Sequence, residues 1–228
     1  MPQIKTVLFD LDGTLADTAP DLADALNYVL RRNNKPILAF EEIRPVVSHG
    51  GIALIKLGFN INQDHPDFES LRQQLLDYYL KNIAAKTKLF DGMERLLMQI
   101  ELNDMNWGVV TNKPSWLTDP LMQALKLDSR AACIVSGDTL KERKPHPAPL
   151  LHACSIARSD FHQCVYIGDA ERDITAGNEA GMQTIIALFG YIRAEDTPDD
   201  WGADYMFNSP DEIASWLGIN TKHEHAEH

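Results

Sequence analysis

The sequence predicts an α/β protein in which a doubly wound parallel sheet carries an inserted domain built of helices. Two patterns predict this architecture. From Lys88 onward, short apolar runs alternate with amphipathic stretches, which is typical of a parallel sheet with helices on both faces. Before that point, residues 17–84 show only helical periodicity, directly after a single strand. The helical stretch therefore interrupts the sheet domain near its start.

The first predicted strand is a largely apolar run over residues 4–9 that ends at two carboxylates, Asp10 and Asp12. Such a run is typical of a strand covered on both faces. Gly13 then permits a sharp turn. Two carboxylates at the end of a core strand are unfavourable unless a cation is bound there, although Asp and Gly also favour ordinary turns. The strand alone leaves both interpretations open.

Helices account for the whole insert. Pro20 stands at a first helical position, and apolar residues then share one helical face up to Leu30. A short helix is predicted over residues 40–47, a third helix begins at Ile52, and a long amphipathic helix covers residues 66–83. We expect residues 48–51, Ser-His-Gly-Gly, to form a flexible turn, and we expect no strand in the insert.

Strands and helices alternate in the second half of the chain. The predicted strands cover residues 107–111, 133–136, 164–167, 184–188 and, at one edge, 205–207. Five helices are predicted between and after these strands. The first opens with a capping box at Asp91, the second covers residues 115–125, and the third follows Pro147. The fourth covers residues 174–180, and the fifth begins at Ser209 and ends at Gly218.

These elements predict two domains and a tail. Residues 1–16 and 85–228 form the sheet domain, and residues 17–84 form the helical insert. At the end of the sheet domain, residues 221–228 are expected to be a disordered tail. Its three histidines could be interpreted as a metal-binding tract, but a solvated chain end is the preferred interpretation.

Composition excludes several classes of function. The chain has 228 residues, of which 44% are hydrophobic, enough for a substantial core. A net charge of -12 argues against nucleic acid and against anionic membranes as partners. The three cysteines form no close pair in the sequence, which favours a reducing compartment. With no secretory or bilayer-length segment, we expect a soluble cytoplasmic protein, monomer or homodimer.

Polar side chains are predicted to meet at the carboxyl ends of the strands, where open parallel sheets bind ligands. The set comprises Asp10, Asp12, Thr111, Asn112, Lys144, Asp169 and Asp173. Four carboxylates on one rim repel one another unless a divalent cation lies between them. Magnesium fits best, because Mg²⁺ accepts carboxylates and shares its other positions with water and phosphate oxygens. Thr111 and Lys144 suit the phosphate.

Four segments in this order resemble the haloacid dehalogenase-like superfamily of phosphohydrolases. They are residues 9–15 (Phe-Asp-Leu-Asp-Gly-Thr-Leu), 110–112 (Val-Thr-Asn), 144–145 (Lys-Pro) and 168–173 (Gly-Asp-Ala-Glu-Arg-Asp). The resemblance spans almost the whole chain and implies a Rossmann-like core with an α-helical cap, here of the phosphoglycolate phosphatase branch. Residues 111–114, 189–192 and 201–204 also resemble bacterial N-acetylmuramic acid 6-phosphate phosphatases.

The resemblance implies a role for each of these carboxylates. Asp10 would attack phosphorus and form an aspartyl-phosphate, and Asp12 would protonate the leaving oxygen and later activate water. Magnesium would be held by the Asp10 carboxylate, the Asp12 backbone carbonyl and Asp169. Asp173 would either bind the metal through a water molecule or position Lys144.

The remaining site residues are expected to contact the substrate. Thr111, Asn112 and Lys144 are the candidates for the phosphate. In the insert, His49 is the best polar candidate for the leaving group, with a solvated loop histidine as the alternative. The expected function is hydrolysis of a small phosphorylated metabolite of the phosphoglycolate or N-acetylmuramic acid 6-phosphate type. A phosphomutase and a non-catalytic binding protein on the same fold are the alternatives.

Overall fold

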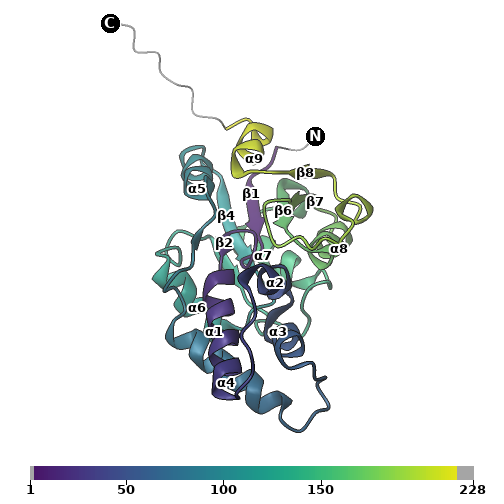
Figure 1. The fold of residues 1–228 in the computed structure, drawn as a ribbon. Coiled ribbons are helices and arrows are strands. Elements are labelled where there is room, and N and C mark those ends of the chain that lie inside the picture. Colours follow the sequence, from purple (N-terminus) through teal and green to yellow (C-terminus); the bar gives the residue numbers. More distant parts are fainter. Residues whose placement is uncertain (1–2, 220–228) are drawn as a thin grey trace, which may run out of the picture.

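A six-stranded sheet forms the centre of the computed structural model, which describes residues 3–219. All of its strand pairs are parallel, in the order β5-β4-β1-β6-β7-β8. The strands are β1 (Thr6–Phe9), β4 (Asn106–Val110), β5 (Cys133–Val135), β6 (Cys164–Gly168), β7 (Gln183–Ala187) and β8 (Tyr205–Phe207). β1 lies between β4 and β6, which places its end beside the point where the strand order reverses (Figure 1).

Helices cover both faces of this sheet, as predicted. One face packs on α5 (Met93–Leu102), α6 (Ser115–Ala124) and α9 (Pro210–Leu217), and the other on α7 (Ala148–Ala157) and α8 (Glu171–Glu179). The alternation of side chains along β1 explains why every residue of that strand is buried. Val7 and Phe9 enter the first core, and Leu8 enters the second.

The helices of the insert share a hydrophobic core, which also takes in Leu117 and Tyr191 from the second half of the chain. It contains α1 (Ala19–Arg32), α2 (Phe40–Ile43), the 3₁₀ helix η1 (Arg44–His49), α3 (Gly50–Phe59) and α4 (Phe68–Lys81). Apolar side chains of α1 such as Leu26 and Leu30 pack against α4 residues such as Leu75. Figure 1 shows this group at the opposite end of the molecule from α9.

Three expectations about local structure were wrong. Residues 48–51 are not a flexible turn, because η1 ends at His49 and α3 begins at Gly50. The capping box at Asp91 does not form: Gly92 is the N-cap of α5 and no side chain caps that helix. The two chain crossings between sheet and insert also pair as short antiparallel strands, β2 (Ala16–Asp17) and β3 (Lys88–Leu89), where no strand was predicted.

Two cysteines that are distant in the sequence lie side by side. The sulfur atoms of Cys154 in α7 and Cys164 in β6 are 3.2 Å apart, and both residues are buried as free thiols. The sequence spacing gave no sign of this pair, because the contact depends on how α7 packs on the sheet.

A buried carboxylate fastens the returning chain to the insert. Asp21 in α1 accepts hydrogen bonds from the backbone of Lys86 and from both the backbone and the hydroxyl of Thr87, at 2.7–3.0 Å. These donors lie on the segment that leads back to the sheet. Asp21 thus holds the second crossing against the first helix of the insert.

Asp21→Ala should lower the free energy of unfolding by about 3 kcal/mol, because it leaves buried donors without an acceptor. Urea denaturation measures this loss. Asp24→Ala is the matched control on the same helix: it removes an exposed ion pair with Lys86 and should cost below about 1 kcal/mol. Equal losses in the two variants would contradict the role of Asp21.

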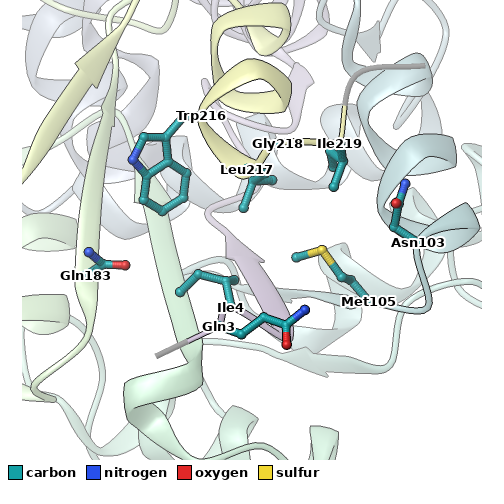
Figure 2. A pocket seen from close by; sticks show the side chains of 9 residues that line it. All are labelled: Gln3, Ile4, Asn103, Met105, Gln183, Trp216, Leu217, Gly218 and Ile219. Atoms are coloured by element: carbon teal, nitrogen blue, oxygen red, sulfur yellow. The ribbon is translucent and has the colours of Figure 1, made fainter. Parts of the chain in front are cut away.

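A cavity of about 390 Å³ lies at the amino ends of the strands (Figure 2). Ile4, Met105 and Gln183 line it just before or at the start of β1, β4 and β7, with Trp216 from α9. It is therefore at the end of the sheet opposite the predicted site. None of the helices in residues 3–219 is long and apolar enough to cross a membrane. The expected tail at residues 221–228 lies outside the described residues.

Candidate active site

The loop after β1 places Asp10 and Asp12 at the centre of the sheet edge. The backbone N–H of Asp10 donates to the carbonyl of Ile167 in β6 at 2.8 Å, so this residue is held as an extension of the sheet. The loop then turns at Gly13, whose φ of +89° favours glycine. A side chain at Gly13 would collide with the carboxylate of Asp169. Glycine here lets the first loop approach the end of β6.

Three of the predicted carboxylates come together. Asp10, Asp169 and Asp173 are buried, and one oxygen of each lies within 4.8 Å of the others. Burial and the charges of Asp10 and Asp173 raise the pKa of Asp169 to about 7. The pKa of Asp173 is also raised, by burial first, although Lys144 opposes that shift. The cluster carries more negative charge than its protein surroundings stabilise.

A bound divalent cation fits this donor set. Hard carboxylate oxygens are the ligands that magnesium prefers, and a cation between them would relieve the repulsion that raises the pKa of Asp169. The Asp12 side chain is not part of this cluster, and the expected contribution of its backbone carbonyl stays a prediction.

Lys144 lies fully buried between two of these carboxylates. Its Nζ donates to Asp10 at 2.9 Å, to Asp173 at 2.7 Å and to the hydroxyl of Tyr166 at 2.6 Å. Tyr166 in turn donates to the Val110 carbonyl at 2.8 Å. The contact between Asp173 and Lys144 is compatible with the expectation that Asp173 positions Lys144, which stays a prediction. The lysine ammonium is fixed beside the oxygen of the candidate nucleophile.

Thr111 and Asn112 follow β4, next to the end of β1. The Thr111 side-chain oxygen accepts the N–H of Lys113 at 3.1 Å, which leaves its hydroxyl proton free to be donated. Asn112 donates its side-chain amide to the Lys144 carbonyl at 2.9 Å. Asn112 thus steadies the loop that carries Lys144, and its expected contact with phosphate stays a prediction.

Asp12 is partly buried and has two side-chain donors. The Thr18 hydroxyl donates to its Oδ1 at 2.6 Å, and Lys113 Nζ donates to the same oxygen at 2.7 Å. Burial acts to lower the pKa of Lys113, but Asp12 and Tyr79 together, through charge and hydrogen bonding, outweigh burial and the pKa is raised. Lys113 therefore stays positively charged beside Asp12 at neutral pH.

The insert touches the site through Ser48. Its hydroxyl donates to Asp169 at 2.9 Å, and its carbonyl accepts from Arg172 at 2.8 Å. His49 is the next residue and is largely exposed. Partial burial, followed by the charges of Arg172 and Arg193, lowers the pKa of His49. Burial, helped by these two positive charges, thus favours the neutral imidazole.

Tyr191 connects the site to the first chain crossing. Its backbone N–H donates to Asp169 at 2.9 Å. Its hydroxyl donates to Asp17 at 2.7 Å and accepts the N–H of Ala19 at 2.8 Å. One buried residue therefore contacts both the acidic cluster and the start of the insert.

Four residues at the site were not predicted as site residues: Ser48, Lys113, Tyr166 and Tyr191. Tyr166 could have been found, because a phenol in an otherwise apolar strand needs a polar partner. Ser48 and Tyr191 lie far in the sequence from their partner Asp169, so only the folded structure shows their roles.

The chain matches known proteins over most of its length. The family model for haloacid dehalogenase-like hydrolases covers residues 7–187. The N-acetylmuramic acid 6-phosphate phosphatase of Pseudomonas putida is 40% identical over 211 residues, which cover 92% of this chain and 95% of that protein. A phosphoglycolate phosphatase of Xanthomonas campestris is 40% identical over 215 residues, covering 93% and 97%.

A solved structure shares the whole fold. The crystal structure of a protein from Haemophilus somnus, described as a predicted phosphoglycolate phosphatase, superposes with a TM-score of 0.83 at 26% identity. The match covers 95% of this chain and 99% of that one. With the family model and the curated relatives, it shows that the chain belongs to the haloacid dehalogenase-like hydrolases and is one of their phosphatases.

Proposed function

We propose that this protein is a magnesium-dependent phosphatase that hydrolyses a small phosphorylated metabolite bearing a carboxylate, through an aspartyl-phosphate intermediate. The observation that carries the proposal is the position of Asp10 at the edge of the sheet. It lies within the acidic cluster of Asp169 and Asp173, with Lys144 bonded to its oxygen at 2.9 Å.

The chemistry follows from the geometry of two carboxylates. An oxygen of Asp10 attacks phosphorus, and the bond to the leaving oxygen breaks as the new bond forms. Asp12 gives its proton to that oxygen and then takes one from the water that hydrolyses the aspartyl-phosphate. Lys144 and the Thr111 hydroxyl stabilise the negative charge of the transferred group.

Asp10, Asp169 and the Asp12 carbonyl would hold the magnesium ion, which supplies charge neutralisation of the phosphate and aligns it with Asp10. Asp173 serves this arrangement by fixing Lys144. Neutralisation matters because a phosphate dianion would otherwise approach three buried carboxylates.

Positively charged residues of the cap interface favour a substrate with a second anionic group. Arg44 donates to the Phe189 carbonyl at 3.4 Å and lies over the Tyr191 ring, and Arg172 donates to the Ser48 carbonyl. The hydrogen bonds described for these guanidinium groups go to backbone carbonyls, and Arg172 also interacts with the charges of Asp173, Asp10 and Asp169. Arg44 is therefore the stronger candidate for a carboxylate of the substrate. Phosphoglycolate and N-acetylmuramic acid 6-phosphate, the substrates named for the relatives, both carry one.

A panel of phosphorylated metabolites tests the function. It should contain phosphoglycolate, N-acetylmuramic acid 6-phosphate, their counterparts without a carboxylate, and p-nitrophenyl phosphate. We expect phosphate release in the presence of magnesium, with kcat/KM highest for one of the two compounds that carry a carboxylate. No release from any compound would overturn the assignment and favour a binding protein. A preference for uncharged leaving groups would overturn only the proposal that the substrate bears a carboxylate.

His49→Ala should lower kcat/KM on the best substrate at least tenfold, about 1.4 kcal/mol. The neutral imidazole is expected to donate or accept a hydrogen bond with the leaving group. Hydrolysis of p-nitrophenyl phosphate should change far less, because that compound lacks those groups. His65→Ala, an exposed histidine elsewhere in the insert, is the control. Equal losses on both substrates would instead indicate a structural role.

A further inference from the structure

Lys113 forms a buried ion pair with the candidate general acid. Its Nζ lies 2.7 Å from Asp12 Oδ1, and only 7% of the lysine side chain and 15% of the aspartate side chain are exposed. A lysine ammonium in such a position is strongly constrained, because moving it away would leave its buried charge without this partner. The mechanism above assigns no role to this residue.

Both donors to Asp12 bind the same oxygen. Thr18 and Lys113 donate to Oδ1, and among the described residues no donor is bonded to Oδ2. One oxygen of the carboxylate is therefore fixed, whereas the other is available to exchange a proton. A general acid gains rate from such fixing, because proton transfer requires the acid within hydrogen-bond reach of the leaving oxygen.

The backbone of Lys113 is held as firmly as its side chain. Its N–H donates to the Thr111 hydroxyl, and its carbonyl accepts from Gly137 at 2.9 Å and from the Thr118 hydroxyl at 3.1 Å. The lysine therefore projects from a rigid turn toward Asp12.

A residue of the insert completes the arrangement. Lys113 Nζ lies 4.6 Å from the ring centroid of Tyr79, a fully buried residue of α4. This is within the range of a cation–π contact. Burial raises the pKa of Tyr79 to about 12, so the phenol keeps its proton and the ring meets the lysine as a neutral group. The insert thus contacts Asp12 through Lys113.

We propose that Lys113 is a positioning residue that holds Asp12 for proton transfer, with Tyr79 of the cap holding Lys113 in turn. The proposal rests on the phosphatase function above. When the bond from phosphorus to the leaving oxygen breaks, the electron pair stays on that oxygen and the proton comes from Asp12. Lys113 contributes by fixing Asp12, and it contacts neither phosphorus nor the leaving oxygen.

Substrates whose leaving groups differ in their need for a proton can distinguish a positioning role of Lys113 from phosphate binding or a purely structural role. Phosphoglycolate and N-acetylmuramic acid 6-phosphate release alkoxides, which need a proton, whereas p-nitrophenolate is stable as an anion. Lys113→Met keeps the length and removes the charge. We expect kcat/KM on the better alkyl phosphate to fall by about 30-fold or more, a large part of the roughly 10²–10⁴-fold that a general acid contributes. On p-nitrophenyl phosphate it should fall less than about threefold, because kcat/KM reports only the phosphorylation step.

The second half of the reaction gives an independent readout. With Asp12 misplaced, water attacks the aspartyl-phosphate slowly, so Lys113→Met should show a burst of p-nitrophenolate followed by slow turnover. Equal losses of kcat/KM on both substrates, without a burst, would overturn the proposal and indicate that Lys113 binds phosphate or only stabilises the fold. Absence of phosphatase activity in the wild type would instead overturn the proposed function itself.

Further variants control for misfolding and test whether Lys113 acts through Asp12. Lys113→Arg retains the charge and should recover part of the alkyl phosphate activity. Tyr79→Leu removes the ring that lies over Lys113 and should lower kcat/KM on the alkyl phosphate more than on p-nitrophenyl phosphate; equal kcat/KM values in this variant and the wild type would contradict the role of Tyr79. Lys141→Met, at a 95% exposed side chain, is the matched control. On an Asp12→Asn background, Lys113→Met should cause less than about a threefold further loss. Full additivity of the two losses would contradict action through Asp12.

Discussion

Asp10→Asn is expected to abolish turnover and to leave the fold intact. The amide is nearly isosteric with the carboxylate and can still accept the hydrogen bond from Lys144, but it cannot attack phosphorus. The change also removes one negative charge from the cluster with Asp169 and Asp173. Without added metal the variant should therefore melt at the same temperature as the wild type or higher, which thermal denaturation measures.

The size of the loss in kcat decides whether Asp10 is the nucleophile. A kcat below about one per cent of the wild-type value, corresponding to more than about 2.7 kcal/mol in the barrier, is required for a nucleophile. Rapid-quench mass spectrometry should detect a phosphorylated peptide containing Asp10 in the wild type and none in the variant. A variant with higher residual turnover would rule out the covalent route through Asp10.

Removal of the metal should have a comparable effect. Excess chelator is expected to abolish activity, and added magnesium should restore it, because the phosphate would otherwise meet three buried carboxylates. Calcium should bind but inhibit, since its larger and looser coordination misplaces the nucleophile. Full activity in chelator would contradict the metal site.

Binding can be measured apart from activity. Magnesium should raise the melting temperature of the wild type, because the ion binds only the folded state. Asp169→Asn should remove most of this increase, since Asp169 is one of the three clustered carboxylates. Glu179→Gln, an exposed residue at the other end of α8, is the control and should keep the increase. An equal increase in Asp169→Asn would place the ion elsewhere.

The sequence predicted the sheet well because each main strand is a distinct apolar run followed by polar loop residues. The antiparallel pair β2 and β3 was missed, since two-residue strands leave no periodicity to detect. The turn expected at residues 48–51 was wrong because consecutive glycines suggested a break, whereas Gly50 and Gly51 begin α3. The prediction of a capping box at Asp91 was wrong because Gly92 takes the N-cap position with a left-handed conformation.

The acidic cluster was predictable because its members directly follow strands of one sheet. Asp10 and Asp169 had to lie close together once β1 and β6 were neighbours. Contacts such as those of Ser48 with Asp169, or of Lys113 with Asp12, depend on how the insert and the loops pack. That packing is set by many weak contacts and leaves no mark in a single motif.

The double contact of Tyr191 links two equilibria. One residue bonds Asp169 through its backbone and the start of the insert through its hydroxyl. If the insert rotates about that crossing, the free energy gained or lost at Asp169 changes the affinity of the cluster for a cation. By thermodynamic reciprocity, cation binding then shifts the orientation of the insert by the same free energy. Cation affinity and the orientation of the insert would then be coupled through this one residue.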